Sequence, residues 1–302
     1  MTVRSKAELA LFGTTAIWGG TFVAMKIGLS DMSSMLQIAL RFMVGALFFL
    51  VFFWRNIFPI PSSAILKGGI LGLFLFLAFA AQTIGLNYTT ASKSAFITGM
   101  MVIFVPLLQV IIERRAPKLG NILGVLVVLL GLWFLTSPTG AEFNVGDALT
   151  LVCAVLFGVY IVYLDVVSKE TTTMQLTFLQ VATCAVLGWT SIVLFEPPSF
   201  AFSEGSIVSL LYLTFLATLL ATYVQTRFQK DTTPTRAVII FTIEPVIASV
   251  AAYLILDEVL GTLGIVGGGL IILGVLVSEF SDAVPGLNMS FDPTQKDPAS
   301  TS

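Results

Sequence analysis

The feature of this chain that most limits its fold is a series of apolar runs, each long enough to cross a lipid bilayer. A membrane-spanning helix needs about 20 consecutive, mostly apolar residues, and such runs recur along the whole sequence. They lie at residues 8–28, 35–54, 67–88, 94–112, 120–136, 147–165, 173–195, 206–226, 237–256 and 261–279. The loops between them are too short to hold a soluble domain. The sequence therefore predicts an all-α membrane protein with ten transmembrane helices.

The low charge of the chain supports a lipid environment. Hydrophobic residues make up 57% of the sequence and charged residues only 11%, whereas a soluble domain carries about 25% charge. A soluble protein with a large core would need charged outer faces on its helices, and this chain has too few charges to supply them. We therefore expect the outer faces of the helices to contact the lipid bilayer.

The basic residues indicate how the predicted helices are oriented. With a cytoplasmic N-terminus, the inner segments carry Arg4, Lys6, Arg55, Lys67, Arg114, Arg115, Lys118, Lys169, Arg227, Lys230 and Arg236. The outer loops carry only Lys93. Lys and Arg are retained on the cytoplasmic side, so we expect a multi-pass protein of the cytoplasmic (inner) membrane with both termini in the cytoplasm. Residues 281–302, rich in Pro, Ser, Asp and Thr, are predicted to form a disordered cytoplasmic tail.

Several kinds of chemistry have no residues to support them. The chain has no histidine, which excludes His-based metal sites and His-dependent nucleophilic catalysis. It has no GxxxxGK[ST] loop for nucleotide phosphates, so an ATP-driven pump is not indicated. Its two cysteines, Cys153 and Cys184, lie inside apolar runs, where they act as small apolar residues. We expect no cofactor, no metal and no nucleic-acid partner, and we expect a monomer.

An internal repeat divides the chain into halves. The matching residues, at shifts of 139 and then 143, include Trp18-Gly19 with Phe157-Gly158, Met35 with Met174, Gln82-Thr83 with Gln225-Thr226, Lys93 with Arg236, and Gly124 with Gly267. Residues 1–140 and 141–280 each hold five predicted spans, and five is odd, so the second half must enter the membrane with opposite polarity. Inverted repeats related by an in-plane twofold axis are typical of secondary transporters, whose substrate site lies between the repeats.

Five stretches also resemble a known family. They are AIWGGTFVAMKIGL, IALRFMVGALFF, TTASKSAFITGMMVIFVPLL, FTIEPVIASVAAYLILDE and GGGLIILGVLV, and they are similar to the EamA-type branch of the drug/metabolite transporter superfamily over about residues 8–279. The resemblance implies a ten-helix exporter of small organic metabolites, often amino acids or drug-like molecules, with a central cavity between its halves. The segment IIERRAP departs from the family pattern, in which an acidic residue commonly follows the fourth span.

Glu244 is the only acid deep inside a predicted span. An ionisable side chain there costs about 2.5–3.5 kcal/mol on insertion scales, so it normally faces a partner or a wet cavity. Pro245 follows directly and should kink the helix. Two interpretations remain open: a cavity-facing acid that binds a cationic group or a proton, or a neutral, hydrogen-bonded brace beside the kink. On the first interpretation, protons are a candidate coupling ion.

Other residues are candidates for the cavity and its motion. Gln82 and Gln225 are polar residues at equivalent positions of the two halves, and Trp18 and Tyr160 are aromatic residues away from the span ends. Arg41 falls on Gln180 in the repeat; it either reaches outward or holds an anionic substrate group. Pro106 and Pro245 are candidate hinges, since prolines kink helices.

A cytoplasmic gate is predicted near Asp165 and Arg236. Asp165 ends the sixth predicted span on the inner side, where Arg236 begins the ninth. We expect an ion pair between this acid and neighbouring bases in the outward-open state, although exposed pairs contribute less than about 1 kcal/mol. Ordinary solvation of loop charges is the alternative.

The predicted function is secondary transport, in which small organic metabolites such as amino acids or drug-like compounds are exported by alternating access. The alternatives are a non-transporting structural or receptor-like membrane protein and a transporter of sugar- or nucleotide-type substrates. An intramembrane enzyme would need a catalytic pair or metal set; Asp165 and Glu244 are the available acids. The expected partners are a small-molecule substrate and the lipid bilayer.

Overall fold

The structure is a computed structural model that describes residues 2–113, 118–135, 144–195, 197–259, 262–280 and 287. Within these residues the chain forms helices joined by short connections, with an isolated antiparallel bridge between Met32 and Phe200. The predicted tail at 281–302 lies outside the described residues, apart from Leu287.

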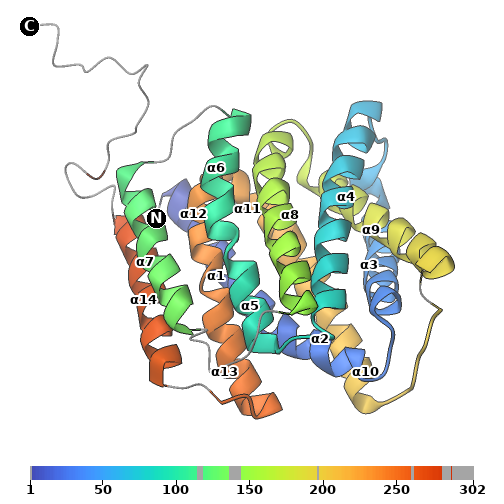
Figure 1. Cartoon of the computed structure of the whole chain (residues 1–302). Helices are drawn as coiled ribbons and strands as arrows, with labels where there is room; N and C mark the ends of the chain where they lie inside the picture. Colours follow the sequence, from blue (N-terminus) through green and yellow to red (C-terminus); the bar gives the residue numbers. More distant parts are fainter. Residues whose placement is uncertain are drawn as a thin grey trace, which may run out of the picture.

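The helices follow one another along the chain as a layered bundle (Figure 1). They are α1 (Val3–Gly19), α2 (Thr21–Leu29), α3 (Ser34–Ile57), α4 (Ser62–Gly85), α5 (Ala91–Gly99), α6 (Met101–Glu113), α7 (Leu119–Leu135), α8 (Val145–Ser168), α9 (Thr173–Phe195), α10 (Glu204–Leu211), the π-helix η1 (Tyr212–Leu220), α11 (Ala221–Phe228), the 3₁₀ turn η2 (Gln229–Asp231), α12 (Pro234–Phe241), α13 (Glu244–Leu256) and α14 (Thr262–Phe280).

Eight helical stretches in the described part of the chain are long and apolar enough to cross a membrane. They are Val3–Leu29, Ser34–Ile57, Ser62–Gly85, Ala91–Ile111, Val145–Ser168, Thr173–Phe195, Glu204–Asp231 and Pro234–Leu256. The remaining two of the ten predicted spans coincide with shorter apolar helices, Leu119–Phe134 and Thr262–Ser278. The fold is therefore a helical membrane fold.

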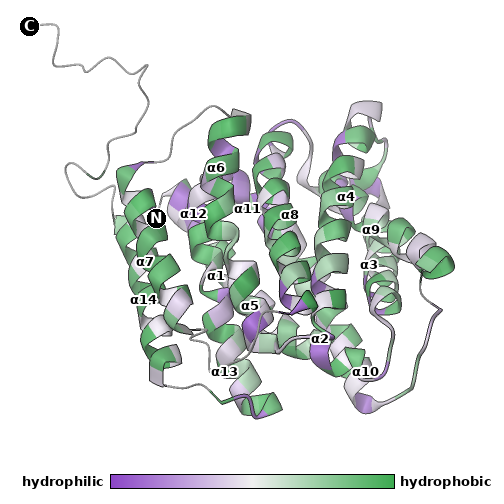
Figure 2. Ribbon diagram, viewed as in Figure 1, coloured by the Kyte–Doolittle hydropathy of each residue, from purple (hydrophilic) through white to green (hydrophobic). Residues whose placement is uncertain are grey.

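The surface of the bundle is apolar, as a lipid-facing surface must be. Figure 2 shows hydrophobic residues along the length of most helices. Large side chains such as Ile111, Val193 and Leu254 lie on the outside of the bundle, with 73%, 82% and 70% of their surface exposed. In water such a surface would promote aggregation, whereas in a bilayer it contacts acyl chains.

Two of the spans are broken at equivalent positions. Met100 separates α5 from α6, and Thr242 and Ile243 separate α12 from α13. Met100 falls on Ile243 at the 143-residue shift, so both halves interrupt the same span at the same place. Glycine is a weak helix former, and Gly99 directly precedes the first break.

The sequence predicts a hinge at Pro106, but the break in this span lies at Met100 instead. The helix α6 runs without interruption from Met101 to Glu113 and contains Pro106, so the break at Met100 lies six residues before that proline. Pro245 instead lies in the first turn of α13, where its missing N–H removes no intrahelical hydrogen bond. The interruption near Pro245 thus agrees with the expected kink, and the interruption in the first half lies at Met100.

Close helix contacts join the two halves on both sides of the bundle. The helices α7 and α14 pack together at the left of Figure 1, and α3 and α9 pack together at the right. A Cβ atom on Gly124 would lie 2.9 Å from the carbonyl oxygen of Gly274, and one on Gly131 would lie 2.7 Å from that of Gly267. These glycines therefore allow the backbones of α7 and α14 to touch.

Candidate substrate cavity

A cavity lies between the two halves of the chain. Its lining residues are Trp18, Thr21, Arg41, Leu75, Phe79, Gln82, Thr98, Met101, Phe157, Tyr160, Ile161, Thr222, Gln225, Phe241 and Glu244. The space open to the centres of water-sized molecules is about 40 Å³, enough for about three waters at 10–15 Å³ each. The cavity is thus compact, and its lining combines aromatic rings with polar and charged side chains.

All six residues that the sequence suggests for a cavity line this one: Trp18, Arg41, Gln82, Tyr160, Gln225 and Glu244. The candidate hinges Pro106 and Pro245 and the candidate gate residues Asp165 and Arg236 do not line it. Sequence reasoning missed the other lining residues, namely Thr21, Leu75, Phe79, Thr98, Met101, Phe157, Ile161, Thr222 and Phe241. Phe157 is the repeat equivalent of Trp18, which is a signal that could have found it.

Most of the lining consists of equivalent residues from the two halves. Twelve of the fifteen lining residues form such pairs, namely Trp18 with Phe157 and Thr21 with Tyr160 at the 139-residue shift, and Phe79 with Thr222, Gln82 with Gln225, Thr98 with Phe241 and Met101 with Glu244 at the 143-residue shift. The remaining three are Arg41, Leu75 and Ile161. Each half therefore supplies nearly the same set of positions to one shared space.

The charged residues break this equivalence. Glu244 corresponds to Met101, and Arg41 corresponds to Gln180. The cavity therefore holds one acid from the second half and one base from the first half. The positions that line the cavity are therefore nearly symmetric between the halves, whereas the charged side chains are not.

Glu244 is the first residue of α13 and directly follows the break between α12 and α13. Its side chain is buried, with 7% of its surface exposed. Among the described residues, no side chain or backbone group forms a hydrogen bond or ion pair with its carboxyl group. The hydrogen bond that the brace interpretation requires is thus not formed within that part of the chain. The N-terminus of α13 favours negative charge at this position.

Arg41 lies on α3 and is 3% exposed. Its Nε–H donates to Oγ1 of Thr218 in η1, and its guanidinium carbon lies 4.5 Å from the ring centre of Phe79 and 5.2 Å from that of Phe42. Aromatic faces attract cations, so these rings hold the guanidinium in place. No carboxylate of the described residues forms an ion pair with it. Arg41 therefore faces the cavity rather than reaching outward.

Hydrogen bonds between amide side chains fix one wall of the cavity. The hydroxyl of Tyr160 donates to Oε1 of Gln180 at 2.8 Å. Oε1 of Gln225 lies 3.3 Å from the hydroxyl oxygen of Tyr160. Nε2 of Gln225 donates to Oε1 of Gln229, and Nε2 of Gln229 donates to the carbonyl oxygen of Ile161. Across the cavity, Nε2 of Gln82 donates to Oγ1 of Thr98 at 3.2 Å.

The tryptophan of the lining is also held by a backbone contact. Nε1–H of Trp18 donates to the carbonyl of Ala217 at 3.2 Å, and its ring meets that of Phe241 edge-on at 5.3 Å. The acceptor residue, Ala217, belongs to the π-helix η1.

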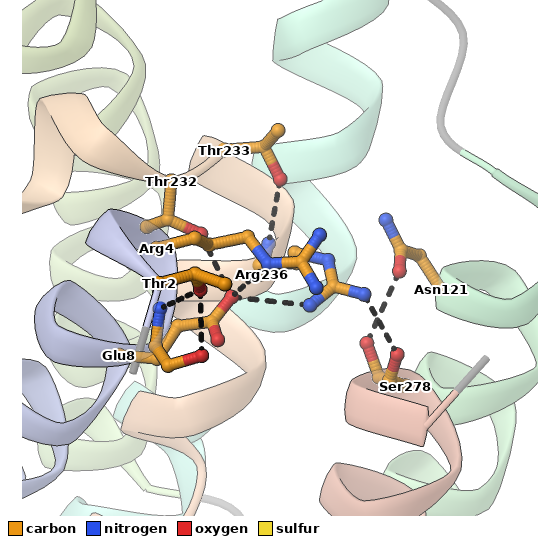
Figure 3. Close-up of polar contacts among 9 residues, drawn as sticks. Thr2, Arg4, Glu8, Asn121, Thr232, Thr233, Arg236 and Ser278 are labelled. Carbon is orange, nitrogen blue, oxygen red and sulfur yellow. Dashed lines mark hydrogen bonds and ion pairs between the residues drawn. The ribbon is translucent and has the colours of Figure 1, made fainter. Parts of the chain in front are cut away.

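Asp165 and Arg236 form ion pairs with other residues in this structure, and the gate expected for the outward-open state stays a prediction. Oδ2 of Asp165 lies 2.5 Å from Nζ of Lys169, one turn further along α8. Arg236 instead contacts Glu8 of α1, with 3.1 Å between Nη1 and Oε1 (Figure 3). The local i,i+4 pairing of Asp165 explains the difference, because Lys169 is always within reach of it.

Comparisons with known proteins agree with the membrane fold. The profile of the EamA-like transporter family matches residues 5–137 and 144–280. An uncharacterized transporter of Archaeoglobus fulgidus is 32% identical over 91% of this chain and 86% of that protein. The uncharacterized transporter YoaV of Bacillus subtilis is 25% identical over 91% of this chain and 97% of its own length.

Two more distant similarities extend this result. Protein PagO of Salmonella typhimurium is 25% identical over 76% of this chain and 79% of its own length. A solved crystal structure superposes with a TM-score of 0.74 at 18% identity, covering 91% of this chain and 96% of that one, which shows the same fold. The family is one of transporters rather than enzymes, and the relatives from Archaeoglobus fulgidus and Bacillus subtilis are named as transporters. This chain is therefore a multi-pass membrane protein that belongs to the EamA-like transporter family.

Proposed function

We propose that this chain is a secondary transporter of the cytoplasmic membrane that exports small zwitterionic metabolites, such as amino acids, by alternating access through the cavity. The observation that carries this proposal is the presence of Arg41 and Glu244 in one cavity, each without an ion-pair partner among the described residues. A buried unpaired charge is costly. A substrate with a carboxylate and an ammonium group would compensate both charges at once.

Alternating access is supported by the way the halves contact each other. Gly124 meets Gly274 and Gly131 meets Gly267, and Gly274 and Gly267 are the repeat equivalents of Gly131 and Gly124. Such reciprocal contacts are the mark of a twofold relation. Residue numbers rise along α7 as they fall along α14, so these helices run antiparallel, and the axis that exchanges them is perpendicular to their length. An axis perpendicular to spanning helices lies in the membrane plane, as in inverted repeats.

A second reciprocal contact involves the spans that carry the breaks. A Cβ on Gly19 would lie 2.5 Å from Cβ of Ile247, and one on Gly158 would lie 3.2 Å from Cβ of Phe104. Gly158 and Ile247 are the repeat equivalents of Gly19 and Phe104. Two inverted five-helix halves, residues 1–140 and 141–280, account for this pattern, and rocking of one half against the other would expose the cavity alternately.

The alternatives fit the cavity less well. A nucleotide-type substrate carries at least two negative charges, and Arg41 is the one basic residue of the lining. A sugar needs neither charge. A structural or receptor-like role gives no reason for two ionisable side chains inside a membrane that lack ion-pair partners among the described residues, since each is expensive there.

The substrate class is tested with purified protein in liposomes. A matched panel would contain one zwitterionic amino acid, its amide, which lacks the carboxylate, and its deaminated acid, which lacks the ammonium group. We expect uptake of the labelled zwitterion to exceed that of both analogues by about tenfold or more, as for charge-assisted hydrogen bonds of about 1.5–3 kcal/mol. Equal flux for all three, or flux equal to that of empty liposomes, would contradict the proposal.

The topology is tested by labelling single cysteines from either side of the membrane. Ten spans with both termini in the cytoplasm place Asp31 and Ser302 on opposite sides. Labelling of cysteines at both positions from the same side would overturn this part of the proposal.

A further inference from the structure

Two clusters of charged residues occupy equivalent positions in the repeat. In each cluster an acid from one half of the chain forms an ion pair with a base from the other half. In the first cluster, Oε1 of Glu8 on α1 accepts from Nη1 of Arg236 on α12 at 3.1 Å (Figure 3). In the second, Oδ2 of Asp147 on α8 accepts from Nζ of Lys93 on α5 at 2.6 Å. Glu8 falls on Asp147 at the 139-residue shift, and Lys93 falls on Arg236 at the 143-residue shift.

The surrounding hydrogen bonds repeat as well. Oγ1 of Thr232 donates to Oε1 of Glu8 at 3.3 Å, and Oγ1 of Thr89, its repeat equivalent, donates to Oδ1 of Asp147 at 2.9 Å. The threonine that caps each basic helix also repeats, as Thr233 before Arg236 and Thr90 before Lys93. The matching extends over acid, base and hydroxyl groups, so it describes one arrangement that occurs twice.

The two clusters lie at opposite ends of the bundle. The backbone N–H of Ala91, at the start of α5, donates to Glu258, just after the end of α13. Oγ1 of Thr235, at the start of α12, donates to Oε1 of Gln109, near the end of α6. The broken spans α5–α6 and α12–α13 therefore run antiparallel, with their starts at opposite ends. A helix of 21 residues, the length of Ala91–Ile111, extends over about 31 Å.

Each cluster also ties one half of the chain to the other. Glu8 and Lys93 belong to residues 1–140, whereas Arg236 and Asp147 belong to residues 141–280. The acids are sheltered, with 11% of Glu8 and none of Asp147 exposed. A sheltered ion pair is strong only while water is excluded, and separation of the halves at one end would admit water there.

We propose that the Glu8–Arg236 pair and the Lys93–Asp147 pair are the matched gates at the two ends of the cavity, and that each opens only while the other stays closed. Both pairs are formed in this structure. Opening either end would hydrate and separate its own pair and leave the opposite pair intact. Removing one acid should therefore shift the protein toward the state that is open at that end, because a population shift follows from a difference in stability between the two states.

An ion pair that lies within one half of the chain provides a matched control. Arg227 and Asp231 form an ion pair one turn apart, with 3.0 Å between Nη1 and Oδ2. Both residues belong to the second half, so their contact has the charge of a gate pair without its position between the halves. Asp231→Asn changes charge by the same amount as Asp147→Asn.

The test is a side-specific labelling experiment that needs no substrate. Cys153 and Cys184 are replaced by alanine, and Met101→Cys in the cavity lining becomes the only target for a membrane-impermeant maleimide applied to either face of sealed vesicles. We expect Glu8→Gln to raise labelling from the Glu8 end relative to the other end by about fivefold or more, a typical lower value for coupled sites. Asp147→Asn should shift the ratio in the opposite direction, and Asp231→Asn should leave it unchanged.

Charge-reversed pairs keep the test decisive if a single variant fails to insert. The double variants Glu8→Arg with Arg236→Glu, and Lys93→Asp with Asp147→Lys, should return the ratio toward that of the unaltered chain. Shifts in the same direction for both single variants, no shift in either, or no recovery in the reversed pairs would overturn the gates.

The inference rests on the proposed transport function, and the same experiment separates the two. If Met101→Cys in the chain without Cys153 and Cys184, and without a gate variant, labels from one face only, alternating access itself is wrong. If it labels from both faces and the gate variants leave the ratio unchanged, only the assignment of the gates is wrong.

Discussion

Gly99 and Pro245 touch where the two broken spans cross. A Cβ atom on Gly99 would lie 3.3 Å from Cγ of Pro245, and 3.4 Å from Cδ2 of Leu132. Gly99 ends α5 just before the break at Met100, and Pro245 begins α13 just after the break at Ile243. The two interruptions are thus in direct contact, and any change of angle at one of them must be accommodated by the other.

This contact predicts that a large side chain at Gly99 impairs transport. Gly99→Leu would place a branched side chain against Pro245 and Leu132, and overpacking of this kind costs about 1–3 kcal/mol. We expect transport in liposomes to fall by about tenfold or more, while substrate binding changes less. Gly69→Leu is the control, because a Cβ at Gly69 meets no atom within 4 Å. Equal transport by both variants would contradict a role for the contact.

Glu244→Gln should weaken substrate binding. The substitution keeps the size of the side chain and removes the charge that we assign to the substrate ammonium group. Charge-assisted hydrogen bonds contribute about 1.5–3 kcal/mol, so we expect the half-saturating concentration of a zwitterionic substrate to rise by about 10- to 150-fold. The deaminated acid should be affected far less, and a similar loss for both compounds would rule out this pairing.

The same variant also tests proton coupling. If Glu244 carries a proton in the transport cycle, flux through the unaltered protein should depend on a pH gradient, and flux through Glu244→Gln should not. Flux is measured with and without an imposed gradient for both proteins. Flux of the unaltered protein that is independent of the gradient would identify facilitated diffusion and exclude protons as the coupling ion.

Arg41→Gln introduces the residue found at the equivalent position of the second half, Gln180. We expect a loss of affinity for substrates with a carboxylate, again about 10-fold or more, and little change for the amide analogue. Arg41→Lys should recover part of the affinity, because lysine retains the charge and lacks the planar fork of arginine. Measurement of binding by isothermal titration, with zwitterion and amide in parallel, distinguishes a lost contact from a misfolded protein.

Gly131→Ala should destabilise the fold, because its Cβ would lie 2.7 Å from both the carbonyl oxygen of Gly267 and the nitrogen of Ile271. We expect a loss of about 1–3 kcal/mol in stability, seen as a lower midpoint of thermal unfolding in detergent. Gly269→Ala on α14 has no atom within 4 Å of its Cβ and should leave the midpoint unchanged. A midpoint for Gly131→Ala equal to that of Gly269→Ala would show that α7 and α14 can separate without cost.

The membrane fold could be predicted from the sequence because each apolar run has the length that a bilayer requires. The residues of the cavity could be predicted for a related reason. Polar and charged groups such as Arg41, Gln82 and Glu244 stand out inside apolar runs, and the repeat indicates which of them face each other. Phe79 and Phe157 have no such contrast with their surroundings, since aromatic side chains suit lipid, core and cavity equally well.

The expected helix break and ion pair show where local patterns mislead. Pro106 removes one backbone hydrogen bond, which helices in membranes tolerate, and α6 continues through it. Asp165 was placed with distant bases although Lys169 lies one turn away; its role as a gate stays a prediction that Asp165→Asn would test. Glu8 resembles an ordinary acid near the start of a helix, and only its equivalence to Asp147 distinguishes it.

The contacts of α7 with α14 and of α3 with α9 lie on the two sides of the bundle, and both join one half to its equivalent in the other. A Cβ at Gly188 of α9 would lie 3.0 Å from Cα of Ala39 on α3, so this second contact is also close to the backbone. Backbone atoms, unlike side chains, cannot move aside by changing rotamer. The two halves can therefore turn about a line through the two contacts. The distances within each contact stay the same, while the two ends of the bundle move in opposite directions.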